Sequence, residues 1–293
     1  MGKLLSMRKV RNILILVAID GSDSSKNALR QTIKFAKKER CGITAVTVIP
    51  SYEGELELGL MSNIKDSFKE PGEKLLAEAS QIAKEEGADL YTILAEGNIH
   101  EAIIDVAESR DCDLIVMGRR GLTNFERAFM GSVTARVIGY SPIDVLVMPH
   151  NSVIKWDNML LAVDGSKHSD IAANRAISIA QAYRGELNAL SVVDVTDEFF
   201  VNAPHAVEQM VKEAKTISKE VETMAQAARV RASSFVREGE AHEKIIGMAE
   251  ELKANVICMG SHGRTGLRRL LMGSVTEKVI GNAPCPVLII KSY

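Results

Sequence analysis

Two sets of glycine and serine residues in this 293-residue chain have types and spacing that suit phosphate binding. Residues 117–132 read MGRRGLTNFERAFMGS, and residues 259–274 read MGSHGRTGLRRLLMGS. In both, an apolar strand-like run precedes the glycines and a helix-like run follows. Amides left open by glycine, followed at once by a helix N-terminus, form a good anion site. The candidate residues are Gly118, Gly121, Gly131 and Ser132 in the first copy and Gly260, Gly263, Gly273 and Ser274 in the second. The alternative is that the glycines only turn the chain and the serines only cap helices.

An aspartate follows the first apolar run of each copy. Asp20 lies in VAIDGS and Asp164 lies in LAVDGS. A carboxylate at the end of a strand can accept hydrogen bonds from a ribose hydroxyl or a base amino group. The competing interpretation is a helix N-cap, because aspartate is common directly before helices.

Basic residues near the glycines are weaker candidates. Arginines in the two loops can screen phosphate charge, although solvated loop arginines are more frequent. His100 and His242 recur in the two copies, and we interpret them as structural, because Ile104 and Ile246 rule out an HExxH zinc helix. The chain also lacks the GxxxxGK(S/T) phosphate loop. The loop arginines are Arg119, Arg120, Arg127, Arg264, Arg268 and Arg269.

The repeat extends along the whole chain and indicates a duplicated domain. GSVTARVIG at 131–139 recurs as GSVTEKVIG at 273–281, and the boundary is expected between residues 152 and 153. We therefore expect two nucleotide-binding domains, 1–152 and 153–293.

Strand-like and helix-like patterns alternate within each copy. Ile13 to Ile19 is a continuous apolar run, as expected for a strand covered on both faces, and a helical stripe from Ala28 to Ala36 follows it. Alternation of this kind predicts an α/β fold with a parallel, doubly wound sheet, which binds ligands beyond the carboxyl ends of its strands. If strand one, residues 13–19, and strand four, residues 114–117, are neighbours, the aspartate and the glycine loop that follow them face one cleft.

Composition narrows the class of protein. A formal net charge of −2 and a pI near 6.3 argue against nucleic-acid binding. Four separated cysteines without a CxxC pair fit a reduced, cytoplasmic protein, and we expect all four in the core. The apolar run after the basic N-terminus resembles an export signal, but it recurs at 159–163 and is too short to span a bilayer. We therefore expect no membrane association.

Taken together, the strand-one aspartate and the spacing GxxG, nine residues, Gly-Ser resemble the universal stress protein family in its ATP-binding branch. Over nearly the whole chain the sequence looks like a tandem member. The resemblance implies two open five-stranded, Rossmann-like parallel sheets of order 3-2-1-4-5 with helices on both faces. It further implies that Asp20 and Asp164 contact the nucleoside and that backbone groups of Val48 and Val192 contact adenine. The glycine loops, Ser132 and Ser274, with Val133 and Val275, would hold the phosphates.

With this resemblance, the sequence features predict a stress-response regulator with one ATP, ADP or AMP site per repeat, with Mg²⁺ carried by the phosphates. The alternative is an enzyme, either a slow ATPase or one related to ATP pyrophosphatases, but DGSDSS at 20–25 lacks the paired glycines of their SGGxDS loop. Enzyme activity therefore stays open, and we expect at most slow hydrolysis.

Three further expectations concern asymmetry and partners. The first loop, with Arg119 and Arg120, has Asn124 where the second has glycine, so its site is the weaker candidate. Residues 51–70, ending before Pro71-Gly72, form a lid, a partner surface or a helix on their own domain. We also expect an internal pseudo-dimer through the last strands, 145–148 and 287–290, with a protein partner or a further homodimer in addition.

Overall fold

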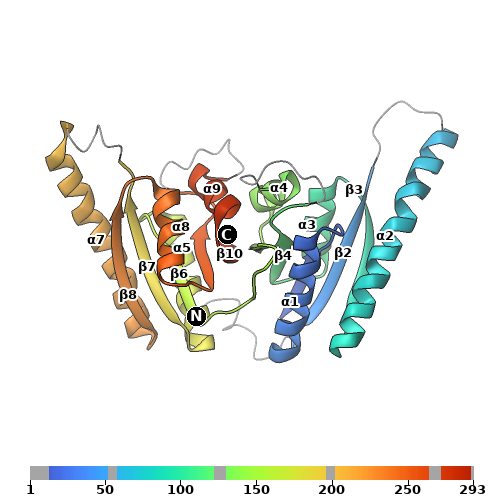
Figure 1. Cartoon of the computed structure of the whole chain (residues 1–293), viewed down its shortest axis with the longest axis horizontal. Helices are drawn as coiled ribbons and strands as arrows, with labels where there is room; N and C mark the ends of the chain where they lie inside the picture. Colours follow the sequence, from blue (N-terminus) through green and yellow to red (C-terminus); the bar gives the residue numbers. More distant parts are fainter. Residues whose placement is uncertain (1–12, 52–57, 122–129, 196–201, 264–271, 292–293) are drawn as a thin grey trace. The chain divides into compact units, whose positions relative to one another are not determined.

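The computed structural model describes residues 13–51, 58–121, 130–195, 202–263 and 272–291. The chain divides into two compact units (Figure 1). One contains residues 11–125 and 131–151, and the bulk of the other is residues 152–293. Each unit alternates strands with helices, as the sequence predicts.

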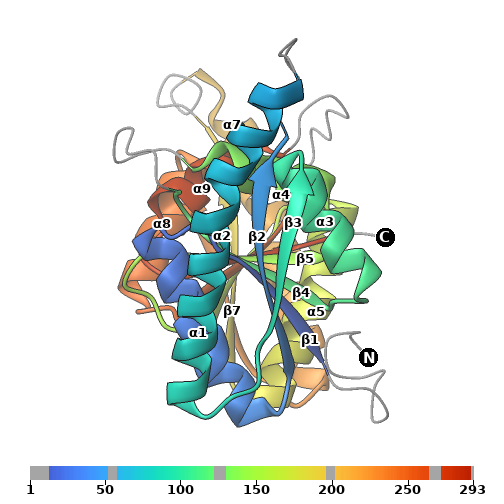
Figure 2. The same ribbon diagram turned by 90° about the vertical axis from the view of Figure 1, so that its right-hand side faces the viewer.

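The first unit is an open parallel sheet of order β3-β2-β1-β4-β5. Figure 2 shows α1 and α2 on one side of its strands and α3 on the other. The order therefore confirms the predicted 3-2-1-4-5 winding. The elements are β1 (Leu14–Ala18), α1 (Asp23–Glu39), β2 (Gly42–Pro50), α2 (Leu58–Glu86), β3 (Tyr91–Gly97), α3 (Ile99–Ser109), β4 (Leu114–Gly118), α4 (Ser132–Tyr140) and β5 (Asp144–Met148).

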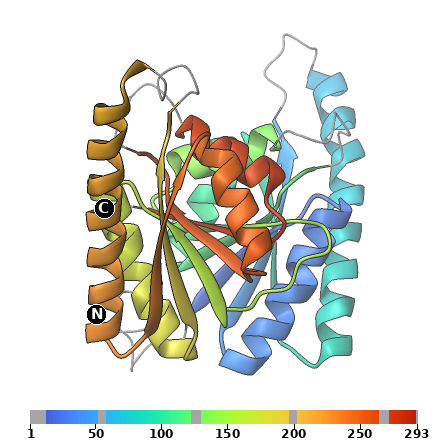
Figure 3. The ribbon, with the colours of Figure 1, turned by 60° about the vertical axis from the view of Figure 1, so that its left-hand side comes forward.

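The second unit repeats this winding, with the strands in the order β10-β9-β6-β7-β8. Figure 3 shows α7 running alongside β8. Its elements are β6 (Asn158–Ala162), α5 (Lys167–Tyr183), β7 (Glu186–Val193), α7 (Pro204–Ala227), β8 (Arg231–Glu238), α8 (Ala241–Glu251), β9 (Val256–Gly260), α9 (Ser274–Asn282) and β10 (Val287–Ile290).

Burial of the central strands explains the continuous apolar runs. Leu16 and Val17 of β1 have no exposed surface, because helices cover both faces of a parallel sheet. Leu29 and Ile33 of α1 supply part of that cover. Since β1 and β4 are parallel neighbours, with Ala18 beside Met117, their carboxyl ends emerge together. This register brings the loops after β1 and β4 to the same edge of the sheet.

Helix α2 begins at Leu58 and continues through Pro71, so the break expected at Pro71-Gly72 is wrong, whereas the helix was one of the three alternatives for the segment before it. Pro71 is exposed, whereas Gly72 is buried against the sheet. A Cβ atom on Gly72 would lie 2.8 Å from Leu94 Cδ1, so glycine allows the helix to pack closely over β3. The free energy of packing against the sheet thus offsets the loss of the backbone hydrogen bond that proline cannot donate. Residues 58–70 belong to this helix, and residues 52–57 lie outside the described part of the chain.

All four cysteines are free thiols. Three are buried as expected, but Cys41 is only half-buried, because it lies in the turn between α1 and β2. Burial, with nearby Glu39 and Asp113, raises the pKa of the Cys41 thiol to about 11, and burial raises that of Cys285 to about 12. Both thiols therefore stay protonated at neutral pH. Among the described helices, none is long and apolar enough to cross a membrane.

Candidate functional site

The strand-one aspartates close a tight turn and do not cap the helix that follows. Asp20 Oδ1 accepts the Ser22 amide at 3.0 Å, and Asp164 Oδ1 accepts the Ser166 amide at 3.0 Å. The N-caps of α1 and α5 are Ser22 and Ser166, which accept N–H bonds three residues on. The helix-cap interpretation of the aspartates is therefore wrong, because the serines two positions later perform that role.

A second pair of serines, which the sequence interpretation did not include, fixes the aspartate backbone. Ser25 Oγ accepts the Asp20 amide at 3.4 Å, and Ser169 Oγ accepts the Asp164 amide at 3.2 Å. The repeated pattern D-G-S-x-x-S in DGSDSS and DGSKHS would have revealed them.

The glycine loops lie directly against these carboxylates. A Cβ atom on Gly121 would be 2.7 Å from Asp20 Oδ2, and one on Gly263 would be 2.7 Å from Asp164 Oδ2. Real Cβ atoms do not approach oxygen so closely, so only glycine fits without a shift. The fold thus brings the strand-one aspartate and the strand-four loop together in each unit.

The first glycine of each loop allows close packing at the end of a strand. A Cβ atom on Gly118 would lie 2.8 Å from the Cβ atom and the carbonyl carbon of Ser24. A Cβ atom on Gly260 would lie 3.1 to 3.2 Å from the Cβ atom and the carbonyl group of His168. The N-terminus of α1 or α5 therefore packs on the end of β4 or β9.

Helices α4 and α9 begin with glycine N-caps. Gly131 and Gly273 are extended and offer no side chain to the first-turn amides, and Ser132 and Ser274 are the first helical residues, both exposed. The alternative that these serines only cap the helices is therefore wrong. An uncapped helix N-terminus with an exposed hydroxyl is suited to an anion.

Thr134 and Thr276, also absent from the sequence interpretation, tie each helix to the start of its loop. Their hydroxyls donate to the carbonyls of Gly118 and Gly260 at 3.2 and 3.3 Å. The Gly131 and Gly273 amides also donate back into their loops, each at 3.1 Å. The repeated GSVT in both copies was the available signal.

In the second unit these elements border a cavity of about 330 Å³. Its polar wall comes from the loops after β6 and β9 and from the start of α9, and its apolar wall comes from β7, α7 and α8. All seven residues predicted for the second site line it: Asp164, Val192, Gly260, Gly263, Gly273, Ser274 and Val275. The volume lies near the lower end of the range of about 300–1,000 Å³ for small-molecule sites.

The first-unit candidates occupy equivalent positions. Asp20 follows β1, Val48 lies near the carboxyl end of β2 beside Ala95, and Val133 is the second residue of α4. Gly118 is the last residue of β4, and Gly121 lies in the loop that follows. Gly131 is the N-cap of α4, and Ser132 is the first residue of that helix. Their binding role, like that of the second set, stays a prediction.

Charged residues distinguish the two loops. Arg119 and Arg120 stand where the second unit has Ser261 and His262. Partial burial, with the neighbouring Arg120, lowers the pKa of Arg119. The other loop arginines, Arg127, Arg264, Arg268 and Arg269, lie outside the described residues, as does Asn124.

The second unit instead has a histidine pair beside the aspartate. The His168 and His262 rings lie 5.5 Å apart between centroids. Partial burial is the main cause that lowers the pKa of His168, and the positive charges of His262 and Lys291 lower it further. The negative charge of Asp164 acts in the opposite direction. Sequence alone did not single out this pair, because the two residues lie far apart along the chain.

The repeated histidines of α3 and α8 differ in exposure. His100 is buried with its ring 5.4 Å from that of Tyr140, whereas His242 is half-buried and 3.4 Å from Glu240 Oε2. The structure thus places His100 in a packed, structural position.

Comparison with known proteins identifies the family. The universal stress protein family matches residues 14–149 and again residues 155–291. A universal stress protein of Mycolicibacterium smegmatis is 25% identical over 288 residues, which is 94% of this chain and 96% of that protein. One from Methanocaldococcus jannaschii is 38% identical over 152 residues, 48% of this chain and 88% of that protein.

A solved structure extends the likeness to the fold. The crystal structure of a universal stress protein from Archaeoglobus fulgidus has a TM-score of 0.74 and 26% identity, and the match covers 95% of this chain and 96% of that one. With two family matches in sequence and the same winding in both units, the chain belongs to the universal stress protein family, in its tandem form.

Proposed function

We propose that this protein binds one adenine nucleotide in each unit and acts as a nucleotide-responsive regulator. The single observation that carries the proposal is the cavity of the second unit, which gathers all seven predicted residues. The resemblance of the sequence to the ATP-binding branch of the family gives the choice of ligand. The first unit is included because its turn, loop and helix start repeat the same hydrogen bonds.

The polar end of the cavity supports phosphate binding. Backbone amides of the glycine loop and the first turn of α9 donate hydrogen bonds, and Ser274 adds a hydroxyl. The positive end of the helix dipole favours a negative charge there. We expect Mg²⁺ to enter bound to the phosphates.

The apolar end supports a base. Leu190, Val193, Met210, Ala214 and Ile245, from β7, α7 and α8, line this part of the cavity. Apolar walls remove the faces of a planar base from water, while polar groups at the edge fix its orientation. Asp164 lines the same cavity, and a ribose hydroxyl can donate to its carboxylate.

Two measurements test the proposal. Mass spectrometry of small molecules released from the purified, heat-denatured protein should detect AMP, ADP or ATP. Calorimetry of nucleotide-free protein with ATP and Mg²⁺ should give a stoichiometry near two. A stoichiometry of zero, at concentrations that would detect a Kd of about 1 mM, contradicts nucleotide binding.

We propose further that the bound nucleotide turns over slowly, if at all, without a partner. Phosphoryl transfer needs a positioned nucleophile and charge donors at the transferred group. The described site offers amides and a serine hydroxyl, which suffice for binding. Steady-state hydrolysis should stay below about 1 s⁻¹, the low end of ordinary enzymes. Faster hydrolysis that disappears in a Ser132→Ala, Ser274→Ala variant which still binds ATP would make the protein an ATPase.

The two units are also proposed to pair as an internal pseudo-dimer through β5 and β10. The physical reason is that each strand is the last of its own sheet and would otherwise leave backbone groups unpaired. In hydrogen exchange, amides of both strands should then be protected like those of the central strand β1. If alternate amides of β5 and β10 exchange as fast as those of the outer strands β3 and β8, the pairing is wrong.

A further inference from the structure

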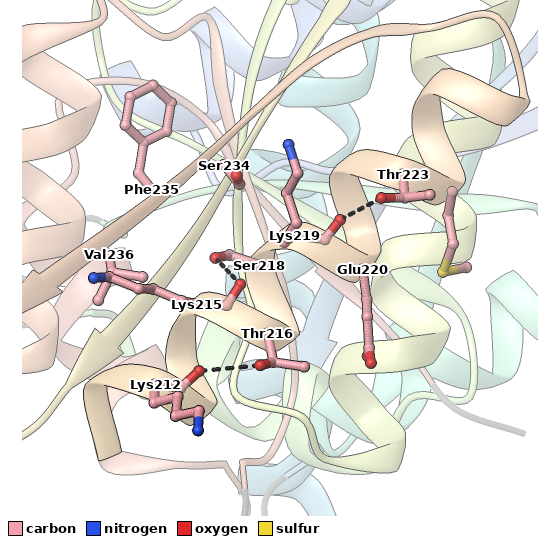
Figure 4. A pocket seen from close by; sticks show the side chains of 11 residues that line it. Lys212, Lys215, Thr216, Ser218, Lys219, Glu220, Thr223, Ser234, Phe235 and Val236 are labelled. Carbon is pink, nitrogen blue, oxygen red and sulfur yellow. Dashed lines mark hydrogen bonds between the residues drawn. The ribbon is translucent and has the colours of Figure 1, made fainter. Parts of the chain in front are cut away.

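A hollow on the second unit lies between α7 and the strand β8 and shares no lining residue with the cavity described above. It has a volume of about 940 Å³. In Figure 4, side chains from α7 and from β8 border it. Its lining from β8 is Ser234, Phe235 and Val236, and three lysines of α7, Lys212, Lys215 and Lys219, are its basic residues.

Strand β8 has an open edge at this hollow. It is the last strand of its sheet and, in the described part of the chain, pairs with β7 alone. Gly239 donates its N–H to Val193 of β7, and alternate residues of a strand direct their backbone groups to opposite edges. The N–H and C=O groups of Ala232, Ser234, Val236 and Glu238 therefore face the open edge. An added strand would find a row of donors and acceptors there.

The lysines follow one stripe of α7. Lys212, Lys215 and Lys219 are spaced three and four residues apart, so their side chains emerge on the same side of the helix. Lys219 pairs with Glu222 at 2.8 Å, whereas Lys212 and Lys215 have no acidic partner among the described residues. Along the helix axis, Lys212 and Lys219 are about 10 Å apart. Residues i and i+4 of an extended strand are about 13 Å apart, which is a similar distance.

The first unit lacks this charge at the equivalent edge. Counting back from the matched glycines Gly97 and Gly239, Lys212 and Lys215 correspond to Glu70 and Glu73, and Lys219 corresponds to Ala77. The basic stripe is therefore a property of the second unit and does not follow from the shared fold.

We propose that the groove between α7 and β8 binds an extended, acidic peptide segment of a partner protein as an added strand. Backbone groups of β8 supply the strand pairing, and side chains on every second residue of the peptide point toward α7. Carboxylates at those positions pair with Lys212 and Lys215, which gives a preference for alternating acidic residues, while Lys219, already paired with Glu222, extends the basic stripe. Val236 and Met224 provide the apolar floor. The Arg237 guanidinium, which donates to the Val236 carbonyl at 3.3 Å, is displaced from that acceptor.

The probe is a fluorescein-labelled ten-residue peptide of alternating Glu and Val, titrated with the full chain and followed by fluorescence anisotropy. We expect a Kd below about 100 μM at low salt, weakening as salt rises. The variant Lys212→Glu, Lys215→Glu, which introduces the residue types of the first unit, should bind at least tenfold more weakly. Lys253→Glu, Lys278→Glu changes the net charge equally at exposed lysines outside the groove and should bind like wild type.

Strand pairing is tested separately. Val236→Pro removes an N–H that faces the open edge and leaves the β7 ladder intact, so binding should weaken at least fivefold while the melting temperature stays close to that of wild type. A peptide that is N-methylated at alternate residues should likewise fail. ATP binding should be unchanged in every groove variant.

Three results overturn the proposal. One is no peptide binding by wild type, and another is equal binding by the Lys212→Glu, Lys215→Glu variant. The third is concentration-dependent self-association of the chain that the same variant abolishes, because the occupant would then be a second copy of this protein.

Discussion

The two nucleotide sites proposed for this chain share a backbone and differ in charge. In each, a carboxylate accepts the amide two residues on, a glycine faces that carboxylate, and a threonine hydroxyl bonds the carbonyl at the start of the loop. Around this common arrangement the first unit has two arginines, whereas the second has two histidines. The comparison indicates that backbone geometry is the shared requirement, while the charge near the anion differs between the units.

The largest expected effect comes from filling the space beside the aspartate. Gly263→Val should abolish the second site and Gly121→Val the first, because each Cβ would lie 2.7 Å from a carboxylate oxygen. Calorimetric stoichiometry should fall from two to one in each variant, with affinity at the altered site lowered roughly 100-fold or more, about 2.7 kcal/mol.

Gly247→Ala is the matched control for these variants. Its Cβ would meet nothing within 4 Å, so binding should be unchanged. A single glycine variant that removed both sites would show that the sites are not independent and would break the comparison.

A smaller effect distinguishes the sites by pH. As the pH falls from 8 to 5.5, the second site should bind ATP more tightly by about three- to tenfold, because His168, whose pKa is lowered in the nucleotide-free protein, gains a proton near the proposed phosphate position. The first site should change little, since arginine stays charged throughout. Calorimetry on Gly121→Val and on Gly263→Val isolates each site for this measurement, and equal pH profiles would contradict the assignment.

The same histidine affects the stability of the nucleotide-free protein with the opposite sign. Since the pKa of His168 is lowered on folding, the unfolded chain binds more protons as pH falls below about 6.5. The stabilising contribution is complete above that pH and is lost as pH falls toward the folded pKa. His168→Gln should flatten the dependence of the melting temperature on pH in this window, and an unchanged slope would show that other groups cause it.

The smallest expected effect concerns salt. Arg119 and Arg120 should make the first site more sensitive to ionic strength, with affinity falling about twofold more than at the second site between about 0.05 and 0.5 M salt. Arg120→His should reduce this sensitivity and give the first site a pH dependence. If that variant keeps the original salt response, the side chain of Arg120 does not act on the ligand.

Much of the fold could be predicted from the sequence, for identifiable reasons. The runs at Ile13–Ile19 and at 159–163 report burial on both faces, and alternation with helical stripes then restricts the sheet to parallel winding. Asp20 and Gly121 could be expected to meet because strands that end at one edge bring their following residues together.

Other features depend on packing between distant segments. Helix α2 passes through Pro71 because Gly72 fits against the sheet. Local helix propensity cannot predict this contact. His168 and His262 become neighbours only when α5 packs on the end of β9, so no periodic pattern in the sequence indicates their pairing. The basic groove on α7 likewise required knowledge of which side of the helix lies beside β8.

Each proposed site draws its residues from one unit, and this has a genetic consequence. In a dimer of identical single-domain chains, every substitution appears twice, so a change that tunes one site alters its twin as well. Here one codon changes one site. The arginines of the first unit and the histidines of the second are differences that a symmetric dimer encoded by one gene cannot hold. Duplication within a single reading frame thus allows two proposed sites of different chemistry to be inherited and produced in a fixed one-to-one ratio.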